Sequence, residues 1–175
     1  MSEILLETDR LLLRHHEPQD LEPYCAMEAD PDVVRYAGGR PRPRERAEER
    51  FRLGIEDTGR LKLWATIYKP EGRYIGRSGV YPHFDANSQP IPGEGALSLY
   101  LMPAYWGRGL ATEAGQALLT MAFSELGLTR VIATVQEGND ASVRVMAKLG
   151  LRLVRTEVGE HRSYLHYEIG PTQVG

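Results

Sequence analysis

The sequence predicts an α+β domain in which one central sheet carries helices on its faces. Two observations predict this class. Short apolar segments typical of strands alternate with longer amphipathic segments typical of helices, in the order strand, two helices, three strands, helix, strand, helix and two strands. The composition, with 42% hydrophobic and 26% charged residues, is that of an ordinary globular protein. No repeat or low-complexity linker divides the 175 residues, so we expect a single domain over 1–175.

The first predicted elements lie in the N-terminal third. A strand is expected over 10–14 and a helix over 18–27, followed by a turn at Asp30-Pro31. A proline-rich stretch then leads into a polar helix from Arg44 to Asp57.

A hairpin and a loop are predicted next. The alternating segments 61–68 and 74–80 lie on either side of KPEGR, which is typical of an antiparallel turn. The Pro/Gly-rich stretch 81–95 predicts a long functional loop, and a strand over 96–102 follows it.

The second half alternates helices and strands. Apolar residues in 109–126 have the i, i+3, i+4, i+7 spacing of a buried helix face. The β-branched run 130–136 indicates a strand covered on both sides. A helix beginning at Asn139 or Asp140 is expected to end at Leu149. Two strands within 151–169 close the chain, and their exposed edge permits pairing into a homodimer.

Composition and charge argue against several function classes. Cys25 is the only cysteine, so neither an intrachain disulfide nor a cysteine-based metal cluster is expected, and its helix indicates a core thiol. The net charge of -3 gives no general attraction to nucleic acid, and the arginines between Arg40 and Arg52 are interleaved with glutamates. No apolar run is long enough to cross a membrane, and the acidic N-terminal stretch does not resemble a signal peptide. We therefore expect a cytoplasmic protein.

The stretch WGRGLA, residues 106–111, joins a predicted strand to a predicted helix. Its glycines leave backbone N–H groups bare at the positive end of the helix dipole, which favours binding of an anion such as a phosphate. Glycine-rich turns are also ordinary helix caps, and the hexamer alone leaves both interpretations open. A P-loop and a dinucleotide fingerprint do not fit, because Arg108-Gly109-Leu110 and Thr112 replace the residues that those motifs need.

A second motif, NDASVRVMAKLGL, covers residues 139–151. Ser142 shares a helical stripe with Val145, Met146 and Leu149, which directs a hydroxyl toward the core-facing side. Ser142 therefore either contributes to chemistry there or caps the helix by bonding a nearby backbone group.

These two motifs, with the strand RVIATV between them, resemble the acetyl-CoA-binding core of the GCN5-related N-acetyltransferases, the GNAT family. The opening ETDRLLLR resembles the start of the ribosomal-protein N-acetyltransferase-like (RimJ/RimL-like) branch, so the resemblance extends from Thr8 to Tyr167. It implies a mixed, largely antiparallel sheet flanked by about four helices. It also implies that the strands 96–102 and 130–136 splay apart around the pantetheine arm of the cofactor.

The resemblance further implies which residues bind acetyl-CoA. Main-chain N–H groups at the glycine turn would hold the diphosphate, main-chain groups near Tyr100 would bond the pantetheine, and Lys148 would approach the distal end. No metal takes part. The full expected set is Tyr100, Leu101, Met102, Trp106, Gly107, Arg108, Gly109, Leu110, Ala111, Thr112, Asn139, Ser142 and Lys148.

Two residues depart from the family pattern. Trp106 stands where many members have Gln or Arg, and Met146 stands where many carry a tyrosine as general acid for the leaving thiolate. The branch resembled points to Ser142 as the acid in this chain. Glu94 or His83, or a water held by them, would serve as the base.

The predicted function is N-acetyl transfer in a ternary complex, directly from acetyl-CoA to an amine. The acceptor would be a protein N-terminal α-amino group or a small-molecule amine. Met146 and the lack of an obvious base leave one alternative, a non-catalytic acyl-CoA-binding or regulatory module on the same fold.

Overall fold

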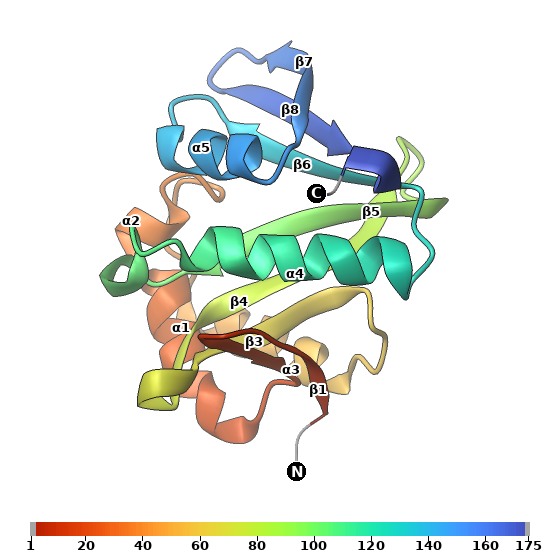
Figure 1. Ribbon diagram of the computed structural model, residues 1–175. Coiled ribbons are helices and arrows are strands. Elements are labelled where there is room, and N and C mark those ends of the chain that lie inside the picture. Colours follow the sequence, from red (N-terminus) through yellow and green to blue (C-terminus); the bar gives the residue numbers. More distant parts are fainter. Residues whose placement is uncertain (1–2, 174–175) are drawn as a thin grey trace.

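A computed structural model describes residues 3–173 and shows an eight-stranded sheet between two layers of helices (Figure 1). The strand order is β1-β2-β3-β4-β5-β6-β8-β7, and every neighbouring pair is antiparallel except β5 and β6. The predicted α+β class with a mixed, largely antiparallel sheet is therefore confirmed. The strands are β1 (Ile4–Glu7), β2 (Leu11–Arg14), β3 (Lys62–Tyr68), β4 (Arg73–Phe84), β5 (Pro90–Leu101), β6 (Arg130–Gln136), β7 (Arg152–Val158) and β8 (Ser163–Ile169).

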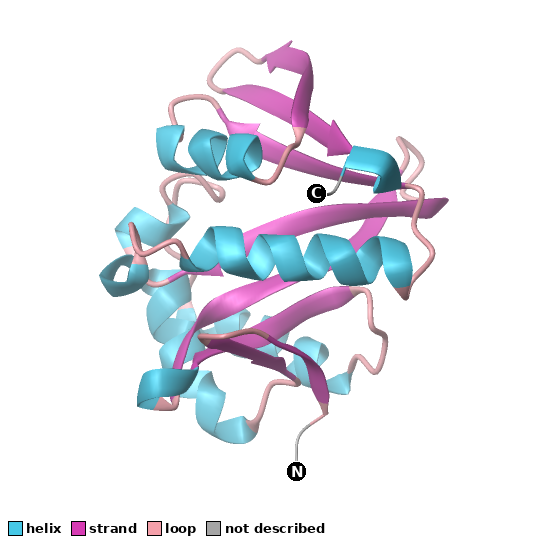
Figure 2. Cartoon of the chain, viewed as in Figure 1, coloured by secondary structure: helices cyan, strands magenta, loops and turns pink. Residues whose placement is uncertain are grey.

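Helices cover both faces of this sheet (Figure 2). On one face lie α4 (Leu110–Ser124), which contacts β4 and β5, and α5 (Asp140–Lys148), which contacts β6. On the other face lie α1 (Leu21–Ala29), which contacts β4, and α3 (Arg44–Glu56), which packs on α1. Within the described residues no helix is long and apolar enough to cross a membrane.

Each face of the sheet buries its own apolar cluster. The larger cluster lies under α4 and includes Trp64, Leu118 and Val131, each fully buried. The smaller cluster joins β3 to the opposite helices and includes Cys25 and Phe51. The prediction of Cys25 as a core thiol is confirmed, because the residue is buried in this second cluster.

Two short elements were missed by the sequence prediction. β1 pairs with β2 at the edge of the sheet, where a four-residue strand gives too short an alternation to be recognised. The predicted turn at Asp30-Pro31 instead begins a one-turn helix, α2 (Pro31–Val34), in which the Asp30 side chain accepts a hydrogen bond from the N–H of Asp32. With α2 the fold has five α-helices among the described residues rather than about four.

The prediction of a long loop over 81–95 was wrong. β4 and β5 continue through most of this stretch, and only Asp85 to Gln89 turn. β3 stops pairing with β4 at Val80, and β6 starts pairing with β5 at Glu94, so the stretch between them forms a two-stranded ribbon beyond the sheet. Its outer edges have no neighbouring strand, which is why its prolines are tolerated.

The prediction that β6 is covered on both sides was also wrong. Val131, Ala133 and Val135 are buried under α4 and α5, whereas Thr134 on the opposite face is exposed. β6 therefore has one face covered by helices and one open face.

His16 provides a pH-dependent element of stability. Its ring is 6% exposed and lies edge-on to the rings of Tyr24 and Phe51. Burial lowers the pKa of His16 to about 4, against the attraction of the Asp20 carboxylate. The unfolded chain, with a pKa of about 6.5, thus binds the proton more readily than the folded chain.

We predict that the free energy of unfolding falls as the pH drops from 6.5 to 4, by about 1.4 kcal/mol per pH unit from this group. His16→Phe, which keeps a ring but cannot be protonated, should remove this contribution, measured by urea unfolding at pH 7 and pH 4.5. His161→Gln, at an exposed histidine, should leave it unchanged. An unaltered pH slope in His16→Phe would contradict the assignment.

Candidate active site

The site begins where β5 and β6 part. The two strands pair in parallel through only three residue pairs, from Glu94 with Arg130 to Ala96 with Ile132. β5 then continues to Leu101 beside β4, and β6 continues to Gln136 beside β8, but the two strands no longer pair with each other. The expected splaying of these strands is confirmed, and it leaves their facing main-chain groups without a partner strand.

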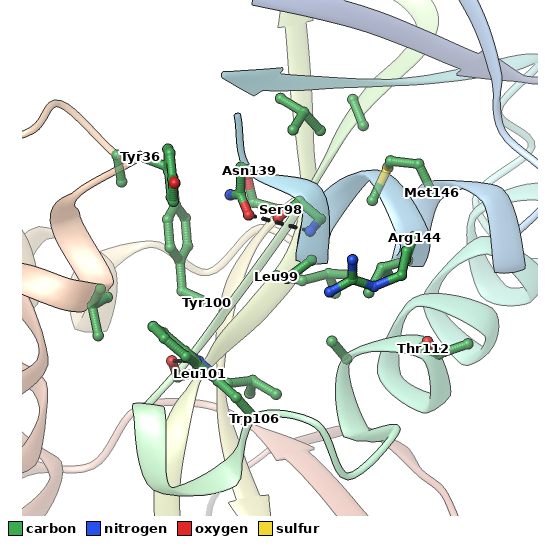
Figure 3. A pocket seen from close by; sticks show the side chains of 18 of the residues that line it. Tyr36, Ser98, Leu99, Tyr100, Leu101, Trp106, Thr112, Asn139, Arg144 and Met146 are labelled. Carbon is green, nitrogen blue, oxygen red and sulfur yellow. Dashed lines mark hydrogen bonds between the residues drawn. The ribbon is translucent and has the colours of Figure 1, made fainter. Parts of the chain in front are cut away.

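A cavity of about 420 Å³ lies at this gap. Its walls come from β5, β6, α4 and α5, and from the segment of α2 on the opposite face of the sheet (Figure 3). The cavity therefore has walls from elements on both faces of the sheet, which gives room for two separate molecules to meet.

The start of α4 forms one end of the cavity. Gly107 and Gly109 have φ angles of 70° and 76°, a left-handed conformation that glycine adopts without strain. No side chain caps α4, so the N–H groups of Leu110, Ala111 and Thr112 have no acceptor within the helix. These bare donors line the cavity, as the anion-site interpretation of the sequence requires.

Trp106 organises the turn before this helix. Its indole N–H donates to the carbonyl oxygen of Leu101 at 2.7 Å. This bond occupies an acceptor at the end of β5 and fixes the direction in which the chain enters the turn. A polar side chain is therefore not needed at this position, which gives a physical account of the departure from the family pattern.

Arg108 and Met102 do not line the cavity, although both were expected in the cofactor set. The guanidinium of Arg108 lies over the rings of Tyr68 and Tyr105, at 4.7 and 5.2 Å from their centroids. The side chain thus points away from the cavity and holds the turn onto the sheet.

The N-terminal hairpin of β1 and β2 also holds this turn in place. Glu113 in the first turn of α4 accepts hydrogen bonds from the Thr8 hydroxyl at 2.6 Å and from Nε of Arg10 at 2.7 Å. Arg10 also donates to the carbonyl oxygen of Arg108 at 3.0 Å. Partial burial raises the pKa of Glu113, but the bonds from Thr8 and Arg10 outweigh this and lower the pKa overall.

The second motif forms the start of α5. Asn139 is the N-cap, because its side chain accepts a hydrogen bond from the N–H of Ser142 at 3.2 Å. The interpretation of Ser142 as the helix cap is therefore wrong. Ser142 lines the cavity together with Asn139 and Lys148, and its half-buried hydroxyl has no hydrogen bond to any described residue.

Glu94 and His83 lie together but outside the cavity wall. His83 Nδ1 is 2.7 Å from Glu94 Oε2, and Arg130 Nη2 donates to the same oxygen at 2.9 Å. Partial burial raises the pKa of Glu94, but the bonds from Arg130 and His83 outweigh this and lower it overall. Glu94 is thus a weaker base than an unpaired carboxylate, and either residue would reach the cavity only through water.

Residues 10–152 match the family described as the acetyltransferase (GNAT) domain, which is more than half of the chain. The chain is also 31% identical over 155 residues to YkkB of Bacillus subtilis, covering 86% of this chain and 87% of that protein. The chain belongs to the GNAT family of acetyltransferases. A further relative, the N-acetyltransferase YnaD of Bacillus subtilis, is 31% identical over 147 residues, covering 84% of this chain and 82% of that protein.

Solved GNAT structures share the fold. A GNAT-family acetyltransferase from Bacillus anthracis matches with a TM-score of 0.81 and 26% identity, covering 94% of this chain and 97% of that chain. Spermidine N-acetyltransferase from Vibrio cholerae, in complex with CoA and spermine, matches with a TM-score of 0.79, covering 95% of this chain and 99% of that chain. At 17% identity this second likeness shows the fold alone.

Several residues that line the GNAT cavity were not among the predicted site residues, and Arg144 and Tyr36 are two of them. Arg144 lies one residue before Val145 of the α5 stripe, and its guanidinium is directed into the cavity (Figure 3). Tyr36 comes from the segment after α2 and also lines it. A helical wheel of α5 could have placed Arg144 beside the cavity. No sequence pattern near Tyr36 indicates that this residue lies beside β5 and the start of α5.

Covalent and metal routes gain no support from the described residues. Burial raises the pKa of the Cys25 thiol, and Cys25 lies on the far side of the sheet from α4. No group of three or more His, Cys, Asp or Glu side chains in the described part of the chain is placed to hold a metal ion.

We predict that Arg10→Ala raises the KM for acetyl-CoA by roughly tenfold, since it removes bonds that hold the glycine turn. The KM for the amine should change less than twofold in the same steady-state assay. Arg60→Ala is the matched control, because Arg60 pairs at 2.8 Å with Glu125 at the other end of α4. Equal effects of the two variants would show that Arg10 contributes only general stability.

Proposed function

We propose that this chain is an acetyl-CoA-dependent N-acetyltransferase that moves the acetyl group directly to an amine in a ternary complex. One observation carries the proposal: the cavity lies at the gap between β5 and β6, with the uncapped start of α4 on one face of the sheet and the α2 segment on the other. Both reactants can therefore meet without a covalent acyl-enzyme.

The cofactor would lie on the face of α4 and α5. Its diphosphate suits the N–H groups of Leu110 to Thr112, and the positive end of the helix dipole adds to their attraction. The pantetheine would follow the main chain of β5 beside Tyr100 and Leu101, along the edge that faces β6 and no longer pairs with it. Asn139 and Ser142 would lie near the thiol end, and Lys148 and Arg144 supply positive charge along the wall.

The chemistry needs a nucleophile, a stabilised oxyanion and a proton for sulfur. The neutral amine nitrogen bonds to the thioester carbonyl carbon, and an N–H group of the unpaired part of β5 would bond the developing oxyanion. The carbon–sulfur bond then breaks. The thiolate takes a proton from the Ser142 hydroxyl or from water, because Met146 cannot provide one.

The proton lost by the acceptor would leave through water held by the Glu94–His83 pair. Glu94 keeps His83 oriented through Nδ1, which leaves Nε2 free to accept a proton. Since neither side chain lines the cavity, we assign them to a water-mediated role rather than to direct contact with the amine.

We further propose that the chain belongs to the ribosomal-protein N-acetyltransferase-like branch and that it acts in the cytoplasm as a homodimer. Its acceptor would be either a protein N-terminus or a small molecule. The homodimer is supported by β7, an edge strand whose residues are all exposed, with Val158 at 82%.

We predict that the protein releases free thiol from acetyl-CoA when a reactive amine is present. Ser142→Ala should lower kcat by about 10²-fold with little change in the KM for acetyl-CoA, because it removes an acid that acts only in the transition state. Ser124→Ala, at a serine in the last turn of α4 that bonds the Thr120 carbonyl, is the matched control and should keep full activity.

The outcomes separate the hypotheses. Unchanged turnover in Ser142→Ala would mean that water protonates the thiolate while acetyl transfer stands. Tight binding of acetyl-CoA without transfer to any amine would favour the alternative of a non-catalytic acyl-CoA-binding module, which the buried Met146 motivates.

A further inference from the structure

The wall of the cavity on the α2 face contains two tyrosines from distant parts of the chain. On β5, Leu99 faces α4, since a Cβ on Gly115 of that helix would lie 3.3 Å from Leu99 Cδ1. Tyr100, the next residue, therefore faces the opposite side of the sheet. Figure 3 shows Tyr100 pointing from β5 toward Tyr36, which comes from the segment after α2.

Buried charges hold Tyr100 in place. The Arg77 guanidinium lies between the rings of Tyr24 and Tyr100, at 5.1 and 4.9 Å from their centroids. Arg77 also donates to the Tyr24 hydroxyl at 3.0 Å and to the carboxylate of Glu28. Arg42 donates to the second oxygen of that carboxylate at 2.6 Å. Arg77 and Glu28 are 8% and 4% exposed, so the ring is fixed before any ligand arrives.

Tyr36 has neighbours on two sides. The guanidinium of Arg35 lies 5.4 Å from the centre of its ring, and a Cβ on Gly138 would lie 4.0 Å from its Cε1. Gly138 directly precedes Asn139, the cap of α5. The tyrosine therefore connects the α2 segment to the end of the cavity that contains Ser142.

The charges of the cavity argue against a polycationic acceptor. Among the described residues that line it, the cations are Arg35, Arg144 and Lys148, and the one carboxylate is that of Asp32. Arg144 and Lys148 belong to the wall proposed for the cofactor, so the α2 side offers a polyamine one carboxylate, Asp32, with the positive charge of Arg35 in the same segment. A single amine nitrogen, by contrast, needs no second carboxylate, and its removal from water favours the neutral form that attacks.

We propose that the acceptor is a primary amine carried on a flat, apolar body, as in an arylalkylamine, and that Tyr36 and Tyr100 contact this body. The inference rests on the proposed function and names the substrate class of the same site. Aromatic rings contact a flat apolar group offset or edge-on, and tyrosines lose little conformational freedom in doing so. Tyr36 and Tyr100 determine specificity, and Arg77 acts as a positioning residue for Tyr100.

The test compares 2-phenylethylamine, spermidine and a short peptide with an N-terminal alanine in one thiol-release assay with acetyl-CoA. We expect kcat/KM for 2-phenylethylamine to exceed that of either other acceptor by about tenfold, the size of one aromatic contact. Tyr36→Ala should raise the KM for 2-phenylethylamine about tenfold and leave the KM for acetyl-CoA within twofold. Tyr36→Phe keeps the ring and should behave as wild type.

Tyr81→Ala is the matched control, because Tyr81 is a partly exposed tyrosine of β4 that does not line this cavity. A preference for spermidine or for the peptide would overturn the inference and leave acetyl transfer standing. An unchanged KM for 2-phenylethylamine in Tyr36→Ala would overturn it as well. No transfer to any of the three amines would overturn both the inference and the proposed function.

Discussion

The early parting of β5 and β6 is the constraint on which the site depends. The two strands are joined through α4, which is the usual connection between parallel neighbours, and three residue pairs are enough to fix their register. Beyond Ala96 the strands separate, and main-chain groups that a continuous sheet would bond to each other are left for a ligand. A fully paired sheet would have no passage from one face to the other.

The groups that would hold the cofactor are mainly backbone, and side chains elsewhere keep them in position. The left-handed glycines before α4 set the direction of its first N–H groups. Arg108 is stacked on Tyr68 and Tyr105 on one side of this turn, and Arg10 bonds it on the other. Recognition of a diphosphate there would therefore depend on residues that do not need to touch it. This dependence explains why a tryptophan is acceptable at the start of the turn.

The sequence predicted the second half of the fold well, because its elements are regular and long. The helix of residues 110–124 has a clear apolar period, and the motif after 139 has a clear cap. The ribbon of 81–95 was mistaken for a loop because prolines usually interrupt strands, and a single sequence does not show that both outer edges are free. Contacts between residues far apart in the sequence were the hardest to predict. Thr8 and Glu113 are 105 residues apart, and no local pattern pairs them.

The same limit applied to the candidate site. The glycine turn and the α5 motif could be placed because the chemistry of a helix entrance is local. The side proposed for the acceptor is formed by α2, the residues that follow it and β5, so its residues could be identified only after the fold was known. Glu94 illustrates the difference, since the sequence placed this candidate base in a loop, whereas the fold places it in β5 and pairs it with Arg130 and His83.

The β4–β5 ribbon has a consequence for how such a protein can diversify. Both of its outer edges are free, and its closing turn is organised by Asp85 alone, whose carboxylate accepts from the N–H groups of Asn87 and Gln89. Lengthening or shortening the ribbon by two cross-strand pairs at a time would preserve which side chains face each way. The length of the ribbon can thus vary over evolution, or by engineering, while the strands of the central sheet keep their register.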